Sequence, residues 1–243
     1  MNMERISVAM AAYNGAEFLS DQIDSILCQL EPQDELVVSY DISNDGTWEL
    51  LTRYQALDSR VKVYKNQHPG IAENFDNALR HCDGDYIFIS DQDDKWTSDK
   101  RVRVVRAFKE TGADMVIHNG IHTNSELKPI SEPFFTTFRI GDGKIRNLIK
   151  SRYSGCCMAF TPQMRDRVVP IPPKVDAYDR WIGTIGEFMG KITYVNDVLL
   201  FHRLHKDNAT PTNPRSFVTI HNARLNLLKH LYLRLKRERN ARK

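Results

Sequence analysis

Strand and helix signals alternate along the first half of this chain, and their order limits the folds open to it more than any other feature. Short apolar runs of strand length are separated by segments whose apolar residues recur at helical spacing, as they do from Leu19 to Leu30. The runs that predict strands cover residues 6–10, 35–40, 61–65, 86–90 and 115–119. This order predicts an α/β fold in which a mostly parallel sheet carries helices on both faces.

Polar clusters follow three of these strands. Tyr13–Gly15 comes after the first strand, residues 41–46 after the second, and residues 91–94 after the fourth. Ligands of open α/β sheets bind beyond the carboxyl ends of the strands. We therefore expect the three clusters to face one crevice that forms the binding site.

The third cluster places Asp91, Asp93 and Asp94 within four positions. Neighbouring carboxylates repel one another, so they need a compensating cation or full solvation. Mg²⁺ or Mn²⁺ would supply that charge and would also stabilise a diphosphate leaving group. The alternative is a solvated turn before a helix that runs from an N-cap at Ser98 to Glu110. The position of the acids directly after a buried-type strand favours the functional interpretation.

Composition narrows the class of protein. A hydrophobic content of 41% and a charged content of 27% are typical of a globular domain. No apolar run is long enough to predict a transmembrane helix, and residues 6–12 are too short and too poorly flanked to predict a signal peptide. The cysteines form no CxxC pair and no zinc spacing, which favours a reduced, cytoplasmic protein. They are Cys28, Cys82, Cys156 and Cys157.

Charge is unevenly distributed. The net charge is +3, but residues 224–243 hold eight Lys or Arg and one Glu, so they carry +7 and the remainder carries −4. An acidic body argues against nucleic acid as a partner, whereas a nucleotide diphosphate is compatible with it if a metal ion offsets the repulsion. Residues 216–243 predict an amphipathic basic helix, which would either lie on an anionic membrane or pack on the domain.

The second half of the chain is less regular. Residues 125–150 are rich in Pro, Gly, Ser and Thr and predict a long loop, which beside a site is often a lid or a substrate-binding segment. A strand is expected at residues 156–161 and a helix at residues 178–188. Residues 192–202 predict two strands with a turn near Asn196.

Five short motifs, in order, resemble the family 2 inverting glycosyltransferases with the GT-A fold, especially their rhamnosyltransferase-like branch of polysaccharide and O-antigen assembly. The resemblance covers residues from about 5 to 210. The motifs are Ile6–Gly15 as the first strand and nucleotide loop, Val38–Thr47 as the aspartate-rich loop, Gly84–Trp96 as the DxD segment, Gly155–Phe160, and Tyr178–Trp181. It implies one GT-A domain over residues 1–215, with a nucleotide-binding donor half to about residue 120 and an acceptor half over residues 121–215, followed by the C-terminal helix at 216–243.

The resemblance implies a donor site. The family's first loop contacts the nucleobase and ribose, and the aspartate of its second loop accepts a hydrogen bond from the base imide of uracil or thymine. The DxD acids contact the ribose and bind Mn²⁺ or Mg²⁺. The donor positions in this chain are Ala11, through its backbone, Tyr13, Asn14, Asp41, Asn74, Asp91, Gln92 and Asp93.

It also implies an acceptor side. Asp179 is the candidate general base, because the attacking hydroxyl must lose a proton as it displaces the nucleotide. Tyr178 and Trp181 flank it and are expected beside the acceptor. Arg203 is expected at the phosphates and His205 at the metal, together with Asp91 and Asp93.

The implied function is transfer of a sugar from a UDP- or dTDP-linked donor to a hydroxyl of a glycan or lipid-linked glycan, in bacterial surface polysaccharide biosynthesis, with a possible peripheral contact at the inner face of the cytoplasmic membrane. The second loop departs from the family pattern at two positions. The family usually has an acid where this chain has Tyr40, and a glycine where it has Ile42. That departure keeps a catalytically inactive glycan- or partner-binding domain open as an alternative. A nucleotidyltransferase would need a Gly-rich, basic first loop, and residues 11–16 hold one glycine and no Lys or Arg.

Overall fold

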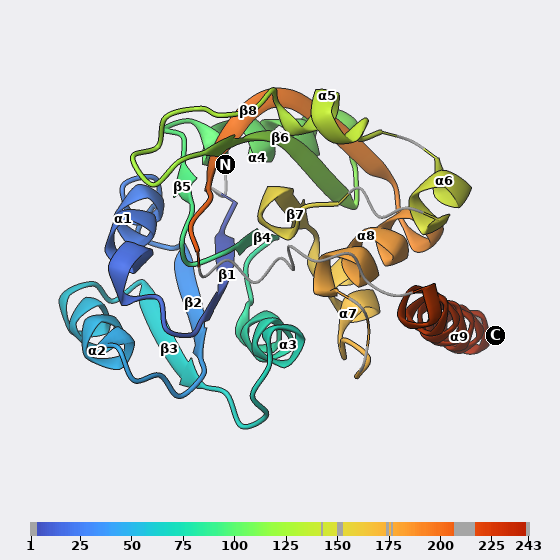
Figure 1. Ribbon diagram of the computed structural model, residues 1–243, viewed down its shortest axis with the longest axis horizontal. Helices are drawn as coiled ribbons and strands as arrows, with labels where there is room; N and C mark the ends of the chain where they lie inside the picture. Colours follow the sequence, from blue (N-terminus) through green and yellow to red (C-terminus); the bar gives the residue numbers. More distant parts are fainter. Residues whose placement is uncertain are drawn as a thin grey trace.

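A computed structural model describes residues 4–141, 143–149, 153–173, 175, 177–206 and 217–241. Within them, one eight-stranded sheet runs in the order β3-β2-β1-β4-β7-β6-β8-β5, with helices on both faces (Figure 1). Alternate residues of the central strands point to opposite faces. Val8 and Met10 join the hydrophobic core on one face of the sheet, whereas Ala9 joins a second core on the other face. The predicted α/β architecture is confirmed.

The first four strands are parallel and lie where the sequence predicts them. They are β1 (Ile6–Ala12), β2 (Glu35–Tyr40), β3 (Val61–Lys65) and β4 (Tyr86–Ser90). Ala12 is in register with Tyr40, and Met10 with Ser90. The carboxyl ends of β1, β2 and β4 therefore reach the same edge of the sheet, and the three polar clusters leave from it.

Helices connect these strands. They are α1 (Ala16–Leu27), α2 (Thr47–Leu57), α3 (Ile71–His81) and α4 (Lys100–Thr111). The N-cap predicted at Ser98 is wrong, because α4 is preceded by Asp99 at the N-cap. The short strand β5 (Lys95–Trp96) pairs with β8, so the chain turns through residues 97–99 before the helix begins.

The second half extends the sheet with strands of both directions. β7 (Met158–Phe160) is antiparallel to β4 and to β6 (Met115–Thr123), and β8 (Ile192–Arg203) is parallel to β6. The predicted strand at 156–161 begins instead as a 3-10 helix, η1 (Gly155–Cys157). The predicted turn near Asn196 is also wrong, because β8 is one strand whose irregularity is a register shift opposite Asn119.

The segment predicted as a long loop contains two short helices, α5 (Phe134–Phe138) and α6 (Lys144–Ile149). Phe134 explains α5, because its ring is buried against Gly120 of β6, where a Cβ atom would lie 2.9 Å from it. Two further helices, α7 (Pro162–Val168) and α8 (Tyr178–Met189), cover the same face of the sheet as α3. The helix predicted at 178–188 is confirmed.

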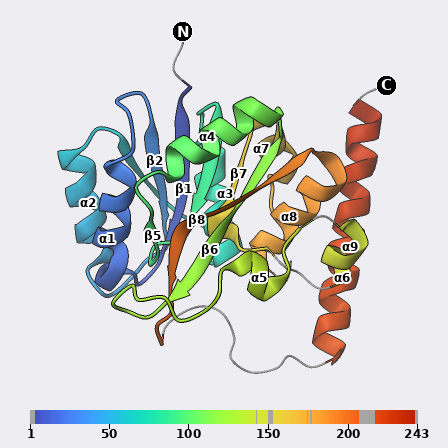
Figure 2. The same ribbon diagram turned by 90° about the horizontal axis from the view of Figure 1, so that it is seen from above.

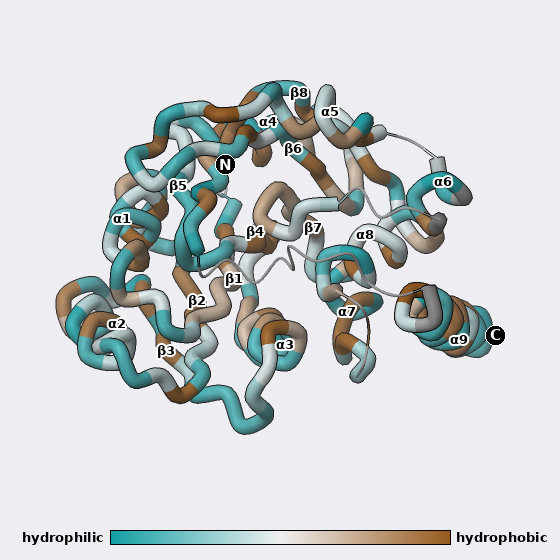
Figure 3. Tube along the Cα trace, viewed as in Figure 1, coloured by the Kyte–Doolittle hydropathy of each residue, from teal (hydrophilic) through white to brown (hydrophobic). Residues whose placement is uncertain are grey.

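A C-terminal helix, α9 (Phe217–Ala241), runs along the outside of α8 (Figure 2). Leu227 and Leu231 are buried against the domain. Arg234 is buried as well, and its guanidinium donates to the carbonyls of Arg167, Val169 and Pro170. Figure 3 shows both hydrophobic and hydrophilic residues along α9. None of the described helices is both long enough and apolar enough to span a bilayer.

Candidate active site

The first two polar loops are joined to each other by hydrogen bonds. The backbone N–H of Asn14 donates to Ser43 Oγ over 2.9 Å, and Asn44 N donates to Asn14 Oδ1 over 3.2 Å. Asn14 adopts a φ of 44°, which asparagine tolerates better than most residues. The side chain of Tyr13 is exposed at this edge, and Ala11 lies within β1 beside it. The loops that the sequence assigns to the donor therefore form one connected surface.

Tyr40 has a definite role in the second loop. Its hydroxyl accepts a hydrogen bond from Ser43 N over 2.9 Å, and its ring packs on Trp48 at 5.0 Å between centroids. The hydroxyl thus provides an acceptor inside the loop where the family usually has an acid. Ile42 is 82% exposed and does not adopt a positive φ, so the loop needs no glycine there.

Gln92 joins the loop that carries the three acids, residues 91–94 (the acid loop), to the first loop. Its Oε1 accepts from Tyr13 N over 2.9 Å, and its Nε2 donates to Tyr13 O over 2.8 Å. Gly15 makes this approach possible, because a Cβ atom there would lie 2.2 Å from Gln92 Oε1. Gln92 is therefore a bridge between two donor loops, which sequence alone did not indicate.

Each of the three acids has its own partner. Tyr178 Oη donates to Asp91 Oδ1 over 2.9 Å, His205 Nε2 lies 2.8 Å from Asp93 Oδ2, and His202 Nδ1 lies 2.8 Å from Asp94 Oδ1. These partners come from α8, from the segment after β8 and from β8 itself. The contacts hold the ends of α8 and β8 against the loop that follows β4.

The acids also repel one another strongly. Burial, together with the charges of Asp94 and Asp93, raises the pKa of Asp91 to about 7. Burial and Asp94 raise the pKa of Asp93 as well, against the effect of His205. Burial opposes the charge on His202, but Asp94 and the other acids raise its pKa to about 10. The cluster therefore favours any cation that approaches it.

Four side chains around the acid loop could hold a metal ion. Ligand atoms of Asp91, Asp94, Cys156 and His202 lie within 4.8 Å of one another, and Asp94 Oδ2 is buried without a hydrogen-bond partner in the described part of the chain. Asp93 and His205 form a separate contact next to them. The carboxylate oxygens of Asp91 and Asp94 suit a hard divalent cation such as Mn²⁺ or Mg²⁺, whereas the thiol of Cys156 is a ligand for softer metals. The sequence predicted Asp91, Asp93 and His205 as metal ligands. It did not predict that Cys156 lies next to Asp91 and Asp94, or that Asp94 pairs with His202.

A buried lysine lies beneath the cluster. Lys100, in the first turn of α4, is fully buried, and its ammonium group donates to Cys156 O over 2.9 Å and lies over the ring of Trp96. Burial lowers its pKa to about 8, while Asp94 and Asp91 act in the opposite direction. The burial of Lys100 could not be predicted from the sequence, because a lysine in a first turn usually points to solvent.

The side chains of Arg203 and Asn74 both make hydrogen bonds to other groups of the protein. The Arg203 guanidinium lies 4.5 Å from the centre of the Phe18 ring and donates to Asp21 Oδ2 over 3.0 Å. Asn74 is buried and donates to Ala12 O over 3.2 Å. Both residues support the edge that carries the donor loops.

The start of α8 carries the predicted acceptor-side residues. Asp179 lies in its first turn and accepts from Arg180 N over 2.6 Å, and burial raises its pKa to about 6. Ala177, not Asp179, is the N-cap. Trp181 does not line the acceptor side: it is fully buried, and its indole N–H donates to Val168 O over 2.9 Å. We therefore assign Trp181 to the core.

The model of one protein family, described as glycosyl transferase family 2, matches residues 7–168. The chain belongs to glycosyl transferase family 2. That stretch includes β1, β2, β4 and the acid loop, so the residues that build the donor edge lie within the matched part.

Individual relatives agree with the family assignment. A provisionally named teichuronic acid biosynthesis glycosyltransferase of Bacillus subtilis is 32% identical over 123 residues, which is 47% of this chain and 49% of that protein. A UDP-Glc:alpha-D-GlcNAc-diphosphoundecaprenol beta-1,3-glucosyltransferase of Escherichia coli is 33% identical over 99 residues, 40% of this chain and 39% of that protein. The chain thus spans about half or less of the length of these curated relatives.

Two solved structures share the fold. Staphylococcus aureus TarS in complex with UDP-GlcNAc aligns with a TM-score of 0.72 and 15% identity, over 93% of this chain and 66% of that one. The mannosyltransferase of Pyrobaculum calidifontis, in complex with GDP-Man and Mn²⁺, aligns with a TM-score of 0.67 and 21% identity, over 86% of this chain and 59% of that one. At these identities the likeness supports the GT-A architecture.

Proposed function

We propose that this glycosyltransferase transfers a sugar, with inversion, from a UDP- or dTDP-linked donor to a hydroxyl of a glycan or lipid-linked glycan in bacterial surface polysaccharide biosynthesis. One observation carries the proposal: the hydrogen bond from Tyr178 to Asp91 brings the start of α8, with Asp179, against the acid loop. The names of the relatives and the resemblance to the rhamnosyltransferase-like branch support the biosynthetic context.

The residues divide the reaction between two sides. Tyr13, Asn14 and Asp41 would receive the nucleoside, and Asp91 and Asp93 the ribose and diphosphate. Asp179 would accept the proton of the attacking hydroxyl, because a pKa near 6 leaves it ionised at neutral pH and still basic enough to act. Direct attack opposite the departing nucleotide accounts for inversion.

We also propose a divalent cation, Mn²⁺ or Mg²⁺, held by Asp91, Asp93 and His205. When bound, it would neutralise the leaving diphosphate. The raised pKa of Asp91 and the buried Asp94 oxygen support the proposal, since both reflect negative charge that lacks full compensation.

The first test is a thermal-shift screen with UDP, dTDP, GDP and CDP, each with and without Mn²⁺. We expect a metal-dependent rise with UDP or dTDP. A ligand at a hundredfold excess over its dissociation constant stabilises a protein by roughly 2.7 kcal/mol, which such a screen detects. No shift with any nucleotide, and no donor hydrolysis by the wild type, would contradict the proposal and favour a non-catalytic domain.

Turnover measurements separate the two sides of the site. Asp93→Ala should weaken metal-dependent donor binding and abolish transfer. Asp179→Asn should abolish transfer and leave nucleotide binding close to that of the wild type. If both variants retain most of their activity, the assignment of the site is wrong.

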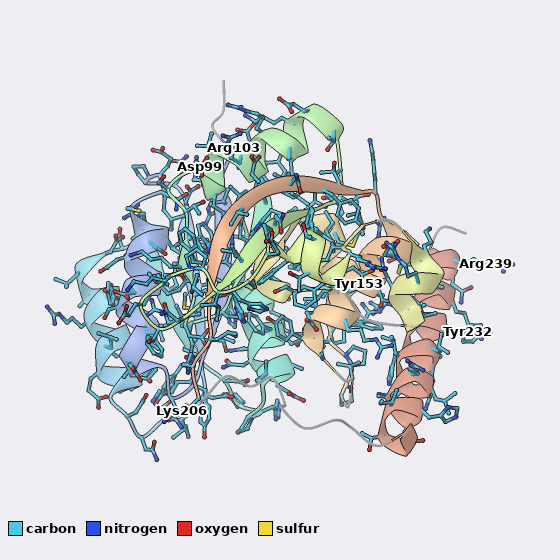
Figure 4. All side chains as sticks on the ribbon, turned by 45° about the horizontal axis from the view of Figure 1, so that its top comes forward. Asp99, Arg103, Tyr153, Lys206, Tyr232 and Arg239 are labelled. Atoms are coloured by element: carbon cyan, nitrogen blue, oxygen red, sulfur yellow. The ribbon has the colours of Figure 1, made fainter. Side chains whose placement is uncertain are left out.

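We further propose a peripheral membrane contact through α9. Leu225, Leu228, Tyr232 and Leu235 are exposed and, at helical spacing, form one stripe beside the face that carries the buried Leu227 and Leu231. Figure 4 shows Tyr232 and Arg239 on the outer side of the helix. Basic residues border the stripe, so its charge complements an anionic lipid surface. They include Arg224, Lys229, Lys236 and Arg239.

Sedimentation with liposomes tests this contact. The double variant Leu228→Ser/Leu235→Ser should lose binding to vesicles of anionic lipid. The matched control Leu57→Ser/Val102→Ser removes two exposed apolar side chains from α2 and α4 and should bind as the wild type does. Equal binding by all three proteins, or by a truncation before residue 216, would exclude the stripe as the contact.

A further inference from the structure

Four side chains from three parts of the chain converge at the acid loop. Asp91 and Asp94 belong to the loop itself, Cys156 belongs to η1, and His202 belongs to β8. One ligand atom of each lies within 4.8 Å of the other three. Ligand atoms bound to one tetrahedral Zn²⁺ ion at about 2.0–2.3 Å lie roughly 3.3–3.6 Å apart. Small rotations of the side chains would therefore bring all four ligand atoms to a single ion.

Asp94 is fully buried, and one of its oxygens has no partner. Oδ1 accepts a hydrogen bond from Arg203 N over 3.3 Å, whereas Oδ2 makes no hydrogen bond within the residues that the structure describes. A buried carboxylate oxygen without a partner is costly, because it has lost its water and has gained no other contact in return. A cation bound at Oδ2 would remove that cost.

The imidazole of His202 faces the same carboxylate. Its Nδ1 lies 2.8 Å from Asp94 Oδ1, but the two atoms are not aligned as a hydrogen bond, and Nδ1 has no other hydrogen-bond partner among the described residues. A nitrogen and an oxygen that approach in this way are placed like two ligands of one metal ion. The neutral imidazole is a common ligand of such ions.

Cys156 decides which metal fits. It is fully buried, and its Sγ lies 3.2 Å from Ser154 Oγ. Thiolate sulfur and imidazole nitrogen favour Zn²⁺, whereas Mg²⁺ and Mn²⁺ prefer oxygen ligands. The thiol would release its proton when the ion binds. The charges then balance, because two carboxylates and one thiolate face a divalent ion and the ammonium group of Lys100, which donates to Cys156 O over 2.9 Å.

We propose that Asp94, Cys156 and His202, with Asp91 as the fourth ligand, form a zinc site. Zinc bound there would join the loop after β4 to η1 and to β8. Its role is structural, because it would fasten the edge that carries the donor loops to the second half of the chain.

This zinc site is separate from the Mn²⁺ or Mg²⁺ site of the proposed function. That site uses Asp93 and His205, which contact each other and do not belong to the group of four. The zinc site also needs no nucleotide, so the proposal does not rest on the proposed function.

Calorimetric titration of the full chain with Zn²⁺ tests the proposal. The protein is first treated with a chelator, and it is kept under reducing conditions with excess Mg²⁺. Co²⁺ serves as a second probe, because a bond from cobalt to a thiolate gives a charge-transfer absorption in the near ultraviolet that oxygen and nitrogen ligands do not give. The variants are Cys156→Ser and His202→Gln, and the controls are Cys157→Ser and Asp93→Ala. Cys157 is the neighbouring buried cysteine of η1 and does not belong to the group of four.

We expect the wild type to bind one equivalent of Zn²⁺ and to show the cobalt absorption. Cys156→Ser should bind Zn²⁺ about a hundredfold more weakly, or worse, and lose the absorption. Loss of a ligand costs more than loss of a group that only orients a ligand, which lowers metal affinity by about 10–100-fold. His202→Gln should weaken Zn²⁺ binding similarly but keep the absorption at saturating Co²⁺, and it carries the test if Cys156→Ser does not fold. Both controls should bind Zn²⁺ as the wild type does.

The alternatives give different results. If the folded wild type binds no Zn²⁺, the proposal is overturned and Asp94 and His202 form only an ion pair. If Asp93→Ala loses Zn²⁺ binding while Cys156→Ser retains it, the ion occupies the site proposed for Mn²⁺ or Mg²⁺, and the zinc site is again wrong. Failure of the wild type to bind any nucleotide diphosphate would contradict the proposed function alone.

Discussion

The hydroxyl of Tyr178 donates to Asp91 Oδ1 over 2.9 Å and thereby joins two positions that lie 87 residues apart in the chain. Burial and the charge of Asp91 raise the pKa of Tyr178 well above its ordinary value, so the hydroxyl stays protonated and acts as a donor. Its ring stacks on Phe75 with centroids 4.1 Å apart, which fixes the direction of the hydroxyl. The first turn of α8 and the acid loop are therefore held as one unit.

Tyr178→Phe should test this contact, because phenylalanine keeps the stack on Phe75 and removes only the hydroxyl. We expect kcat/KM to fall by the equivalent of about 1–3 kcal/mol. The hydrogen bond stabilises the ionised form of Asp91, so its loss raises a pKa that is already about 7. The deficit should therefore be larger at pH 6 than at pH 8. A deficit in kcat/KM that is constant across this range would show that Tyr178 does not act through the ionisation of Asp91.

Asp179 should set the acidic limb of the pH profile. A general base works only when deprotonated, and burial raises the pKa of Asp179 to about 6. At saturating donor and metal, kcat should rise as the pH passes through about 6 and then level off. Asp179→Asn should reduce kcat by about 10²- to 10⁴-fold and abolish that limb. An unchanged limb in a partly active variant would assign the base to another residue.

Gln92→Ala should loosen the donor site more than the fold. The variant loses both hydrogen bonds to the Tyr13 backbone, each worth about 0.5–1.5 kcal/mol. We expect nucleotide affinity to fall by the equivalent of about 1–3 kcal/mol, which is roughly five- to 150-fold. Gln55→Ala is the control, because Gln55 also makes a hydrogen bond to backbone, to Val63 N, but away from the site. Similar nucleotide affinities in the two variants would show that the hydrogen bonds of Gln92 do not contribute to the donor site.

Much of the donor half could be predicted from the sequence, because its signals are local. The strands at 35–40, 61–65 and 86–90 stand where apolar runs of strand length are bounded by turn residues. The same locality allowed the acid loop to be placed at the carboxyl edge. The pairing of Asp94 with His202 could not be predicted, because it depends on the pairing of β8 with β5, which brings His202 beside the acid loop.

The second half was harder to predict, since tertiary contacts decide its local structure. β7 is only three residues long and exists because β4 and β6 leave room for an antiparallel strand between them. Helix α5 forms in a segment rich in turn residues because Phe134 fills a space left by Gly120. Trp181 illustrates the limit of a motif, which gives a position in the chain but not whether the side chain is exposed.

Trp181→Phe should therefore affect stability, not acceptor binding. The indole is fully buried, donates to Val168 O, and lies 5.5 Å from the Arg234 guanidinium of α9. Loss of the hydrogen bond and of part of the ring should lower the free energy of unfolding by about 1–3 kcal/mol, measured by urea denaturation. The KM for the acceptor should not change in folded protein. A raised KM at unchanged stability would return Trp181 to the acceptor side.

Lys100 should make the stability of the protein depend on pH between about 8 and 10.5. Burial lowers its pKa in the folded state from 10.5 to about 8, so between these values the unfolded chain holds a proton that the folded chain has released. Raising the pH through this window therefore favours the folded state, by at most about 1.4 kcal/mol per pH unit. Lys100→Met removes the titrating group, and other groups titrate equally in both proteins. Urea unfolding at pH 7.5, 8.5 and 9.5 should show the wild type gaining stability relative to the variant as the pH rises. Parallel curves would mean that the ammonium group of Lys100 keeps its proton beneath the acids.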